Sequence, residues 1–268
     1  MVGHAEYDYS GESAIVTGST KGIGRGIAEG LADAGANVVV NSPTEAEVTA
    51  VAEELDDCGE GDVVGIAADV GDPAAVERLV ERAVDAFDEI DLLVNNAAVW
   101  PREESLVDAS LDAWDDTMDV NVRAQYYASK LVASHMIDHG IEGCIVNHTS
   151  QAGDRRTGPF GFYGISKTSI NGLTWRMAQE LAEHGIRMNA VSTDVTETAQ
   201  TRYEAEMEAE ETPDKTADDV LRERGEKRPL GRIGHPSDLA DAVLFLASDR
   251  ASYVVGDVLR VSGGGNLE

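Results

Sequence analysis

The chain has 268 residues, of which 42% are apolar, so it can bury a sizeable core in one or two domains. Its 21 Lys and Arg residues are outnumbered by 50 Asp and Glu residues, and the formal net charge is −29. This charge argues against nucleic acid and anionic membranes as partners, because both bind basic surfaces. The sequence shows neither an apolar run of roughly 18 residues that could span a bilayer nor a secretory signal, so we expect a cytoplasmic protein.

Strands and helices are predicted to alternate along the chain. Short apolar runs predict buried strands, and apolar residues at helical spacing predict the helices between them. Asp72 followed by Pro73 is typical of a helix start. The predicted strands cover residues 13–17, 36–40, 62–66, 90–94, 144–148 and 186–191, and the predicted helices include 45–55, 73–87, 112–139 and 162–184.

This alternation predicts an α/β fold, a doubly wound parallel sheet covered by helices on both faces. No linker-like stretch divides residues 1–268, so we expect a single domain with about seven strands. Residues 197–229, before the last helix, are rich in charge and lack a continuous apolar stripe. They suit either a solvated, partly disordered excursion or a mobile lid over an active site.

A glycine-rich loop follows the first predicted strand. Residues 17–24 read TGSTKGIG, and the helix begins within them. Gly18, Gly22 and Gly24 allow a tight turn and close backbone approach, and the free N–H groups of the helix start suit a pyrophosphate. The spacing TGxxxGxG resembles the signature of short-chain dehydrogenases/reductases rather than GxGxxG.

Further motifs support this resemblance over nearly the whole chain. NNAA at 95–98 is similar to the family's NNAG, Asn121 lies in DVNVRA, Ser150 precedes Tyr163 by the usual interval, and residues 163–167 read YGISK. Residues 229–264 match the family's C-terminal segment. The resemblance implies a Rossmann fold and is nearest to the oxoacyl-reductase and sugar-dehydrogenase branch.

The resemblance implies a catalytic set of Asn121, Ser150, Tyr163 and Lys167. Hydride transfer at a carbinol carbon needs a group that moves the hydroxyl proton, and a phenol can do this. Lys167 is predicted to lower the pKa of Tyr163, Ser150 to bind the substrate oxygen, and Asn121 to position a water. The cofactor-binding residues that the resemblance implies are Gly18, Thr20, Lys21, Gly22, Ile23, Gly24, Asn41, Asp69, Val70, Asn96, Ala97, Tyr163, Lys167, Thr196 and Thr198; no metal site is expected.

The residue type at the end of the second predicted strand helps to distinguish an NADP-binding protein from an NAD-binding one. An acidic residue there would bind a ribose 2′-hydroxyl and repel a 2′-phosphate. The chain has Asn41-Ser42-Pro43 instead, and Lys21 stands where NADP-using relatives often carry a basic residue. Arg25 is a second candidate cation. We therefore expect NADP, with NAD as the alternative.

The chain departs from the family pattern after the sixth predicted strand. Thr193 and Asp194 replace the usual Pro and Gly, and a carboxylate near phosphates is unfavourable unless it is paired or turned outward. The candidate substrate-pocket residues are Gln151, Arg155, Arg156 and Tyr203. The two arginines suit a carboxylate or phosphate, and equally a surface salt bridge.

These observations predict an NAD(P)-dependent oxidoreductase acting on a secondary alcohol or ketone, with a sugar, polyol or 3-oxoacyl thioester as substrate. A non-catalytic dinucleotide sensor is the alternative. The resemblance implies a homotetramer formed through two long helices. Trp114, Met118, Val122 and Leu131 suit such an interface, and they suit the core equally.

The charge generates a prediction about salt. A chain of charge −29 repels itself at low ionic strength, and about 1 M salt shortens the screening length to about 3 Å. We expect the protein of a salt-loving organism; an ordinary acidic bacterial enzyme is the alternative. Its thermal unfolding midpoint, followed by circular dichroism, should rise as KCl increases from 0.1 M toward saturation. A midpoint that is independent of KCl would contradict the salt-loving assignment.

Overall fold

A seven-stranded parallel sheet forms the centre of the protein. The computed structural model describes residues 5–101, 105–155, 160–212, 214–265 and 267. The strands lie in the order β3-β2-β1-β4-β5-β6-β7, all parallel. Their bounds are Ser13–Val16 for β1, Asn37–Ser42 for β2, Val63–Ala67 for β3, Leu92–Asn95 for β4, Cys144–Ser150 for β5, Arg187–Thr193 for β6 and Val258–Val261 for β7. The strand order reverses between β1 and β4, and ligands of such sheets bind at the carboxyl ends of the strands beside this reversal.

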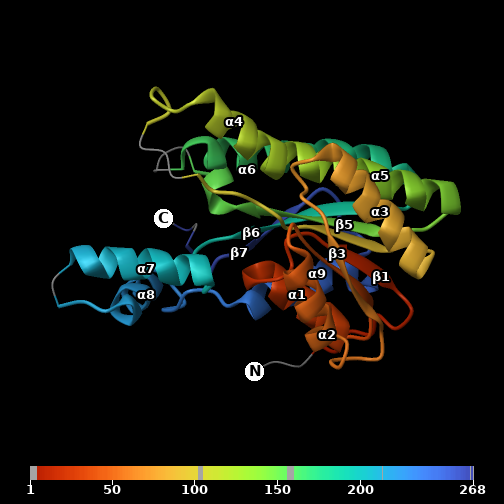
Figure 1. Ribbon diagram of the computed structural model, residues 1–268, viewed down its shortest axis with the longest axis horizontal. Helices are drawn as coiled ribbons and strands as arrows, with labels where there is room; N and C mark the ends of the chain where they lie inside the picture. The colour runs from red at the N-terminus through yellow and green to blue at the C-terminus, as the bar shows by residue number, and fades with distance from the viewer. Residues whose placement is uncertain (1–4, 102–104, 156–159, 213, 266, 268) are drawn as a thin grey trace.

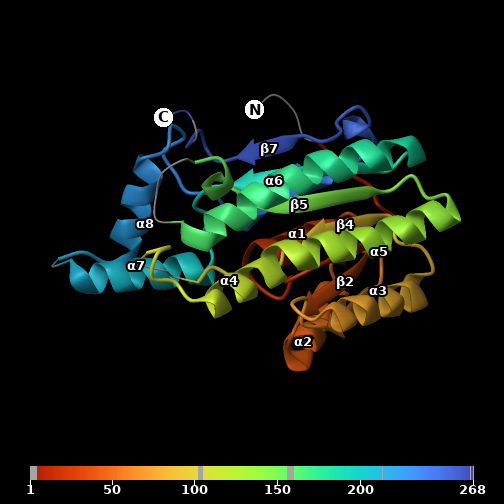
Figure 2. The same ribbon diagram turned by 90° about the horizontal axis from the view of Figure 1, so that it is seen from above.

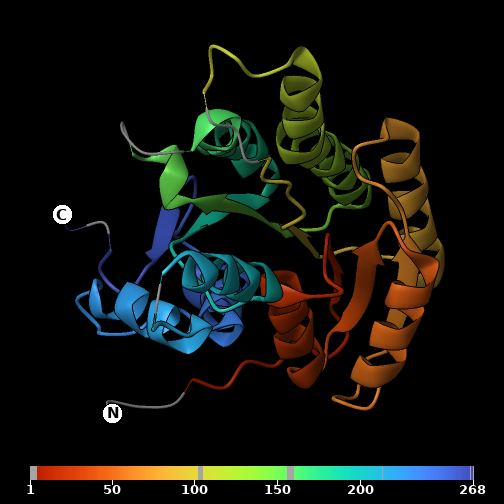
Figure 3. The ribbon, with the colours of Figure 1, turned by 60° about the vertical axis from the view of Figure 1, so that its left-hand side comes forward.

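Helices cover both faces of the sheet, as the alternation predicted (Figure 1). Neighbouring strand residues point to opposite faces, so Ala14 and Val16 join one core cluster and Ile15 joins the other. One layer consists of α1 (Gly22–Asp33), α2 (Glu45–Leu55) and α9 (Pro236–Ala247). The other contains α3 (Pro73–Phe87), α4 (Leu111–Met118), α5 (Ala124–His139) and α6 (Gly161–Leu181), of which α3, α5 and α6 lie side by side (Figure 2). Figure 3 shows the sheet between the two layers. The protein is thus a single-domain Rossmann fold.

The predicted elements are present, with one interruption. The six predicted strands end within two residues of β1 to β6, and the side chain of Asp72 caps α3 by accepting a hydrogen bond from the amide of Ala74. The predicted helical stretch over 112–139 is present as α4 and α5, joined by a π-helical turn at Asp119–Arg123. Such turns often mark functional sites, and this one contains Asn121.

The segment after β6 is a pair of helices rather than a disordered excursion. α7 (Ala199–Glu211) and α8 (Ala217–Glu226) extend from the body of the molecule (Figure 1). They share a small core of Ala205, Val220, Leu221 and Ile233. These few apolar side chains are sufficient to join two short helices. The segment therefore needs no long apolar stripe, and its sequence shows none.

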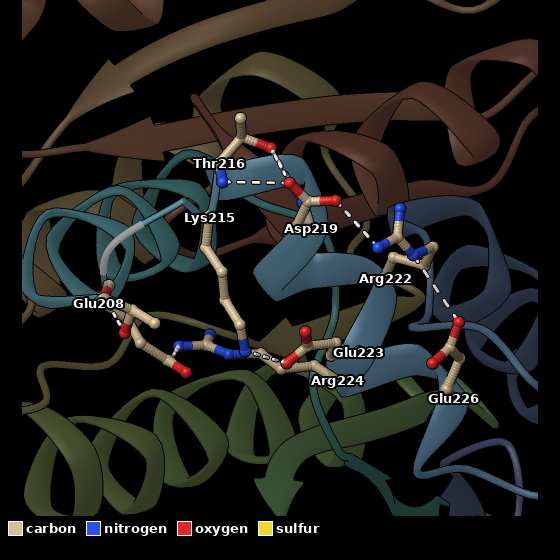
Figure 4. Close-up of polar contacts among 9 residues, drawn as sticks. Glu208, Lys215, Thr216, Asp219, Arg222, Glu223, Arg224 and Glu226 are labelled. Carbon is tan, nitrogen blue, oxygen red and sulfur yellow. Dashed lines mark hydrogen bonds and ion pairs between the residues drawn. The ribbon is translucent and has the colours of Figure 1, made fainter.

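Charged side chains provide most of the other contacts between and within α7 and α8 (Figure 4). Lys215 pairs with Glu223 at 2.6 Å, and Arg224 of α8 pairs with Glu208 of α7 at 2.7 Å. Thr216 and Asp219 form a capping box at the start of α8. Exposed pairs contribute little individually, so the small apolar core and these ion pairs hold the two helices only weakly.

No helix within the described ranges combines the length and the apolarity needed to cross a membrane.

Candidate functional site

The loop between β1 and α1 packs so closely against the residues after β4 that it requires glycine. Gly18 has a φ of +62°, and a Cβ atom there would lie 2.9 Å from Cα of Ala97. A Cβ atom on Gly24 would lie 2.3 Å from the amide nitrogen of Asn96. The side chain of Lys21 does not cap α1, so the first N–H groups of the helix remain available to an anion.

Two asparagine side chains, buried Asn41 and half-buried Asn96, hold this loop in place. The Asn96 amide donates to the carbonyls of Thr17 at 2.9 Å and Gly18 at 3.0 Å. The Asn41 amide donates to the carbonyls of Ile66 and Ala68, both at 3.1 Å, and its oxygen accepts from the amide of Gly18. The amide hydrogens of Asn96 therefore hold the loop directly, whereas those of Asn41 fix its side chain at the end of β3 so that its oxygen holds Gly18.

A cavity of about 410 Å³ lies between this loop and the ends of β2, β3 and β4. All but two of the residues predicted to bind the cofactor line it. Gly22 does not, although a Cβ atom there would lie 3.3 Å from Thr198. Thr196 lines the neighbouring cavity, and its hydroxyl is 2.8 Å from that of Thr193. The predicted residues that line the cavity are Gly18, Thr20, Lys21, Ile23, Gly24, Asn41, Asp69, Val70, Asn96, Ala97, Tyr163, Lys167 and Thr198.

An acidic side chain that the sequence did not reveal reaches the far end of this cavity. The carboxylate of Glu47, in the first turn of α2, accepts hydrogen bonds from Thr20 at 3.1 Å and Ser42 at 3.2 Å. No acidic residue follows β2 directly, but Glu47 on α2 lines the same cavity as Lys21. Arg25 points elsewhere and pairs with Glu54 at 2.5 Å. Apart from Lys167, the charged residues that line the cavity are therefore Lys21, Glu47 and Asp69.

The predicted catalytic side chains come together where β5 meets α6. Lys167 lies one helical turn after Tyr163, and its Nζ atom is 5.5 Å from the centre of the Tyr163 ring. The Tyr163 hydroxyl is hydrogen-bonded to Ser150, at the end of β5. Lys167 is fully buried and donates to the carbonyl of His148 at 2.8 Å.

Burial shifts the pKa values of Tyr163 and Lys167 in opposite directions. Burial raises the pKa of Tyr163 to about 12, although the hydrogen bond from Ser150 opposes the rise. Burial likewise lowers the pKa of Lys167 to about 7. Desolvation disfavours the charged form of each group, and the lowering of the Tyr163 pKa by Lys167 stays a prediction. Tyr163 is therefore a protonated phenol at neutral pH.

Asn121 acts on the neighbouring backbone through its side chain. Its amide donates to the carbonyl of Val99 at 2.9 Å and to the hydroxyl of Ser166 at 3.0 Å, and its oxygen accepts from the amide of Val99 at 2.8 Å. Both amide hydrogens are thus used. Asn121 ties the segment after β4 to α6, the helix that carries Tyr163 and Lys167.

A second cavity, of about 220 Å³, adjoins the first. Ser150, Gln151 and Arg155 line one side of it, and the Trp100 ring, stacked on Tyr163 with centroids 5.3 Å apart, lines another. Gln151 and Arg155 thus lie where they were predicted. Tyr203 does not, because its side chain on α7 is 55% exposed and outside the cavity. Arg156 lies outside the described residues.

Four residues line both cavities and mark their junction: Ile23, His148, Tyr163 and Thr198. His148 was not predicted, although it shares a strand face with Ser150 two positions later. Its Nδ1 atom is 3.0 Å from the oxygen of Asn96, and burial lowers its pKa to about 3, so the ring is neutral. Of these four residues, Tyr163 is the one whose hydroxyl contacts Ser150, and this hydroxyl carries a proton.

Asp194, the departure from the family pattern, is neutralised by an arginine. Its carboxylate accepts from Nε of Arg228 at 2.7 Å, and both side chains are nearly buried. Asp194 lines the second cavity and not the first. Of the two alternatives that the sequence left open, a paired carboxylate or one turned outward, the structure shows the paired one.

In the parts of the chain that the structure describes, no group of three or more His, Cys, Asp or Glu side chains is arranged to hold a metal ion.

The fold and these two cavities define a dinucleotide-binding α/β protein with a tyrosine–lysine–serine site. Residues 18–266 match the family model described as enoyl-(acyl carrier protein) reductase. Dehydrogenase/reductase SDR family member 4 of Caenorhabditis elegans is 34% identical over 96% of this chain and 95% of its own length. The 2-dehydro-3-deoxy-D-gluconate 5-dehydrogenase of Escherichia coli is also 34% identical, over 96% of both chains.

Solved structures agree with these sequence matches. The L-sorbose reductase of Gluconobacter frateurii, determined with NADPH and L-sorbose, superposes with a TM-score of 0.93. It is 27% identical, and the match covers 98% of this chain and 100% of the reductase. The chain belongs to the short-chain dehydrogenase/reductase family of oxidoreductases.

The buried Asp194–Arg228 pair generates a prediction about stability. Asp194→Asn leaves the guanidinium of Arg228 without its counterion, and we expect the free energy of unfolding to fall by about 2–4 kcal/mol. The Kd for the dinucleotide should stay within about threefold, because Asp194 lies outside the first cavity. Urea unfolding and fluorescence titration measure the two quantities.

A matched control is Asp154→Asn, which breaks the more exposed pair with Arg260 at 3.0 Å. It should cost less than about 1 kcal/mol. Equal losses in the two variants would show that the Asp194 pair has no special structural role, and a weakened dinucleotide Kd in Asp194→Asn would place this residue in the cofactor site.

Proposed function

We propose that the protein is an NADP-dependent dehydrogenase/reductase that interconverts a secondary alcohol and a ketone of a sugar or polyol. The observation that carries the proposal is the position of Tyr163, whose hydroxyl contacts Ser150 and whose side chain lines both cavities. Hydride transfer requires the nicotinamide and the substrate to meet at one point, and the junction of the cavities supplies it. Ser150, Gln151 and Arg155 offer hydrogen-bonding groups to a hydroxylated substrate within a lining that is otherwise mostly apolar.

The first cavity suits a dinucleotide. Its glycine loop leaves space that a Cβ atom would fill, and the open start of α1 suits the charge of a pyrophosphate. A bound nicotinamide supplies the hydride that the side chains lack. Lys167 and Tyr163 are the residues expected to hold its ribose, because both reach this cavity from one face of α6.

Tyr163 acts as the general acid in the reducing direction. Its raised pKa keeps the phenol protonated, so a proton is available for the carbonyl oxygen as the hydride arrives. Ser150 binds the same oxygen and stabilises the charge that develops on it. The buried ammonium of Lys167 then stabilises the phenolate. Asn121 is a positioning residue that orients α6 through Ser166.

We propose that α7 and α8 form a lid over the second cavity. Gln200 and Thr201 of α7 and Arg224 of α8 line it, so any movement of the helix pair changes access to Tyr163. The few apolar contacts and the exposed ion pairs of this segment suit such movement.

Further parts of the proposal concern assembly and surroundings. We propose a homotetramer in the cytoplasm of a salt-loving organism. Exposed Tyr126 and Ile137 on α5 and Ile165 and Trp175 on α6 are available for an interface. Of the side chains predicted for this face, Trp114, Met118, Val122 and Leu131 are all half-buried, and Leu131 packs against the core.

Tyr163→Phe tests the catalytic proposal. The variant keeps the ring that stacks on Trp100 and loses only the proton, so kcat should fall by about 10²–10⁴-fold. The Kd for NADPH, measured by fluorescence, should change by less than about threefold. L-Sorbose and other ketones serve as substrates in KCl. Tyr203→Phe, on the exposed surface of α7, is the matched control and should retain wild-type turnover. Near-normal turnover by Tyr163→Phe would refute the assignment, and a wild-type protein that binds NADPH but reduces no carbonyl compound would favour the sensor.

Lys21 and Glu47 test the cofactor preference. Lys21→Met should reduce the ratio of NADPH to NADH affinity by about tenfold, because the 2′-phosphate loses its cation. Glu47→Gln should raise the same ratio severalfold, because a carboxylate beside the phosphate is removed. The NADH Kd of each variant is the internal control. Tighter binding of NADH than NADPH by the wild-type protein would overturn the NADP assignment.

A further inference from the structure

The inner side of the second cavity presents hydrogen-bond donors that lack acceptors. Gln151 follows Ser150 directly and is only 3% exposed. Its side-chain oxygen accepts from Nη2 of Arg155 at 2.8 Å, and this contact fixes which end of the amide is nitrogen. The buried Nε2 atom then has no hydrogen-bond partner among the described residues. A buried amide of this kind is costly unless a ligand accepts its hydrogens.

Arg155 adds a positive charge beside this amide. It donates to two neutral oxygens, those of the Gln151 side chain and the Gly265 backbone, the latter at 3.3 Å. No carboxylate of the described residues lies within ion-pair distance of it. Among the described arginines that line the second cavity, Arg224 pairs with carboxylates, whereas Arg155 does not. The surface salt bridge that the sequence also allowed for Arg155 is therefore not formed with a described residue.

The acidic side chains of the cavity are already matched by arginines. Asp194 pairs with Arg228 at 2.7 Å, and Glu204 lies 3.8 Å from Arg224, which also pairs with Glu208. These pairs leave Arg155, which is exposed, without a carboxylate partner among the described residues. Hydroxyl groups of a ligand would both donate and accept, whereas Gln151 Nε2 and Arg155 only donate. An acceptor-only group, an anion, satisfies both.

We propose that the substrate is a polyhydroxy keto acid or its alcohol, and that Arg155 and Gln151 bind its carboxylate. One guanidinium and one amide suit a single negative charge better than a phosphate ester, which carries more charge and more acceptor oxygens. The carboxylate lies at the Gln151 side of the cavity, and the reacting carbonyl lies at Ser150 and Tyr163. This inference rests on the proposed function, because it names the substrate class of the same site.

Two ketones that differ only at one terminus test the inference. 5-Dehydro-D-gluconate has the carbon skeleton and stereochemistry of L-sorbose, with the hydroxymethyl group farther from the ketone oxidised to a carboxylate. We expect the wild-type protein to reduce the acid with a kcat/KM at least tenfold higher than that of L-sorbose, with NADPH and at one KCl concentration. Arg155→Met should remove this preference, mainly through a higher KM for the acid, and should leave L-sorbose within about threefold.

Two further variants separate charge recognition from a structural role. Gln151→Glu keeps the shape of the side chain but supplies a carboxylate that pairs with Arg155, so it should lose the same preference. Arg82→Met removes a positive charge from the exposed surface of α3 and should leave the preference unchanged. Circular dichroism in the same buffer checks that each variant is folded.

A binding measurement complements the kinetics. Calorimetry with Tyr163→Phe and NADP should show tighter binding of D-gluconate than of D-glucitol, its neutral counterpart, and Arg155→Met in this background should abolish the difference. If the wild-type protein reduces the acid and L-sorbose with equal kcat/KM, the inference is overturned. The proposed function stays intact in that case, because L-sorbose is still reduced. Reduction of neither ketone, with D-gluconate bound no more tightly than D-glucitol, also overturns it. If the wild-type protein does not bind NADPH, the proposed function itself is contradicted, and with it the inference that rests on it.

Discussion

The contact between the loop after β1 and the segment after β4 is the constraint on which the site depends. Gly18 and Gly24 approach Ala97 and Asn96 at distances that exclude a Cβ atom, and the Asn96 side chain closes the contact with two hydrogen bonds to the loop backbone. This contact lies where the strand order reverses, so it forms one wall of the dinucleotide cavity. The oxygen of Asn96 also faces His148, which links the loop to the strand carrying Ser150.

Burial controls the chemistry of the residues on the other side of the site. Lys167 and Tyr163 share one face of α6, and their enclosure favours the neutral form of each. A protonated phenol next to a lysine is suited to proton donation, since the phenolate and the ammonium stabilise each other once both form. The cost of burying Lys167 is thus linked to its function, as is common at active sites.

Much of this arrangement follows from local sequence. Short apolar runs and glycine turns predicted β1 to β6 to within two residues, and the spacing of Tyr163 and Lys167 placed them on one helix face. The π-helical turn around Asn121 was not predictable, because it preserves the helical pattern of apolar residues on both sides. α7 and α8 were missed because their shared core is too small to give a periodic signal.

The sequence by itself determined the parallel sheet and the glycine loop and predicted the catalytic side chains, because these depend on residue type and short-range spacing. Only the tertiary structure decided which charges are compensated. Asp194 is neutralised by Arg228, 34 residues later, Glu47 returns from α2 to the end of the cofactor cavity, and Arg155 has only neutral partners among the described residues. Coulombic interactions and desolvation depend on distances in space between residues far apart in the chain, so sequence patterns do not contain them.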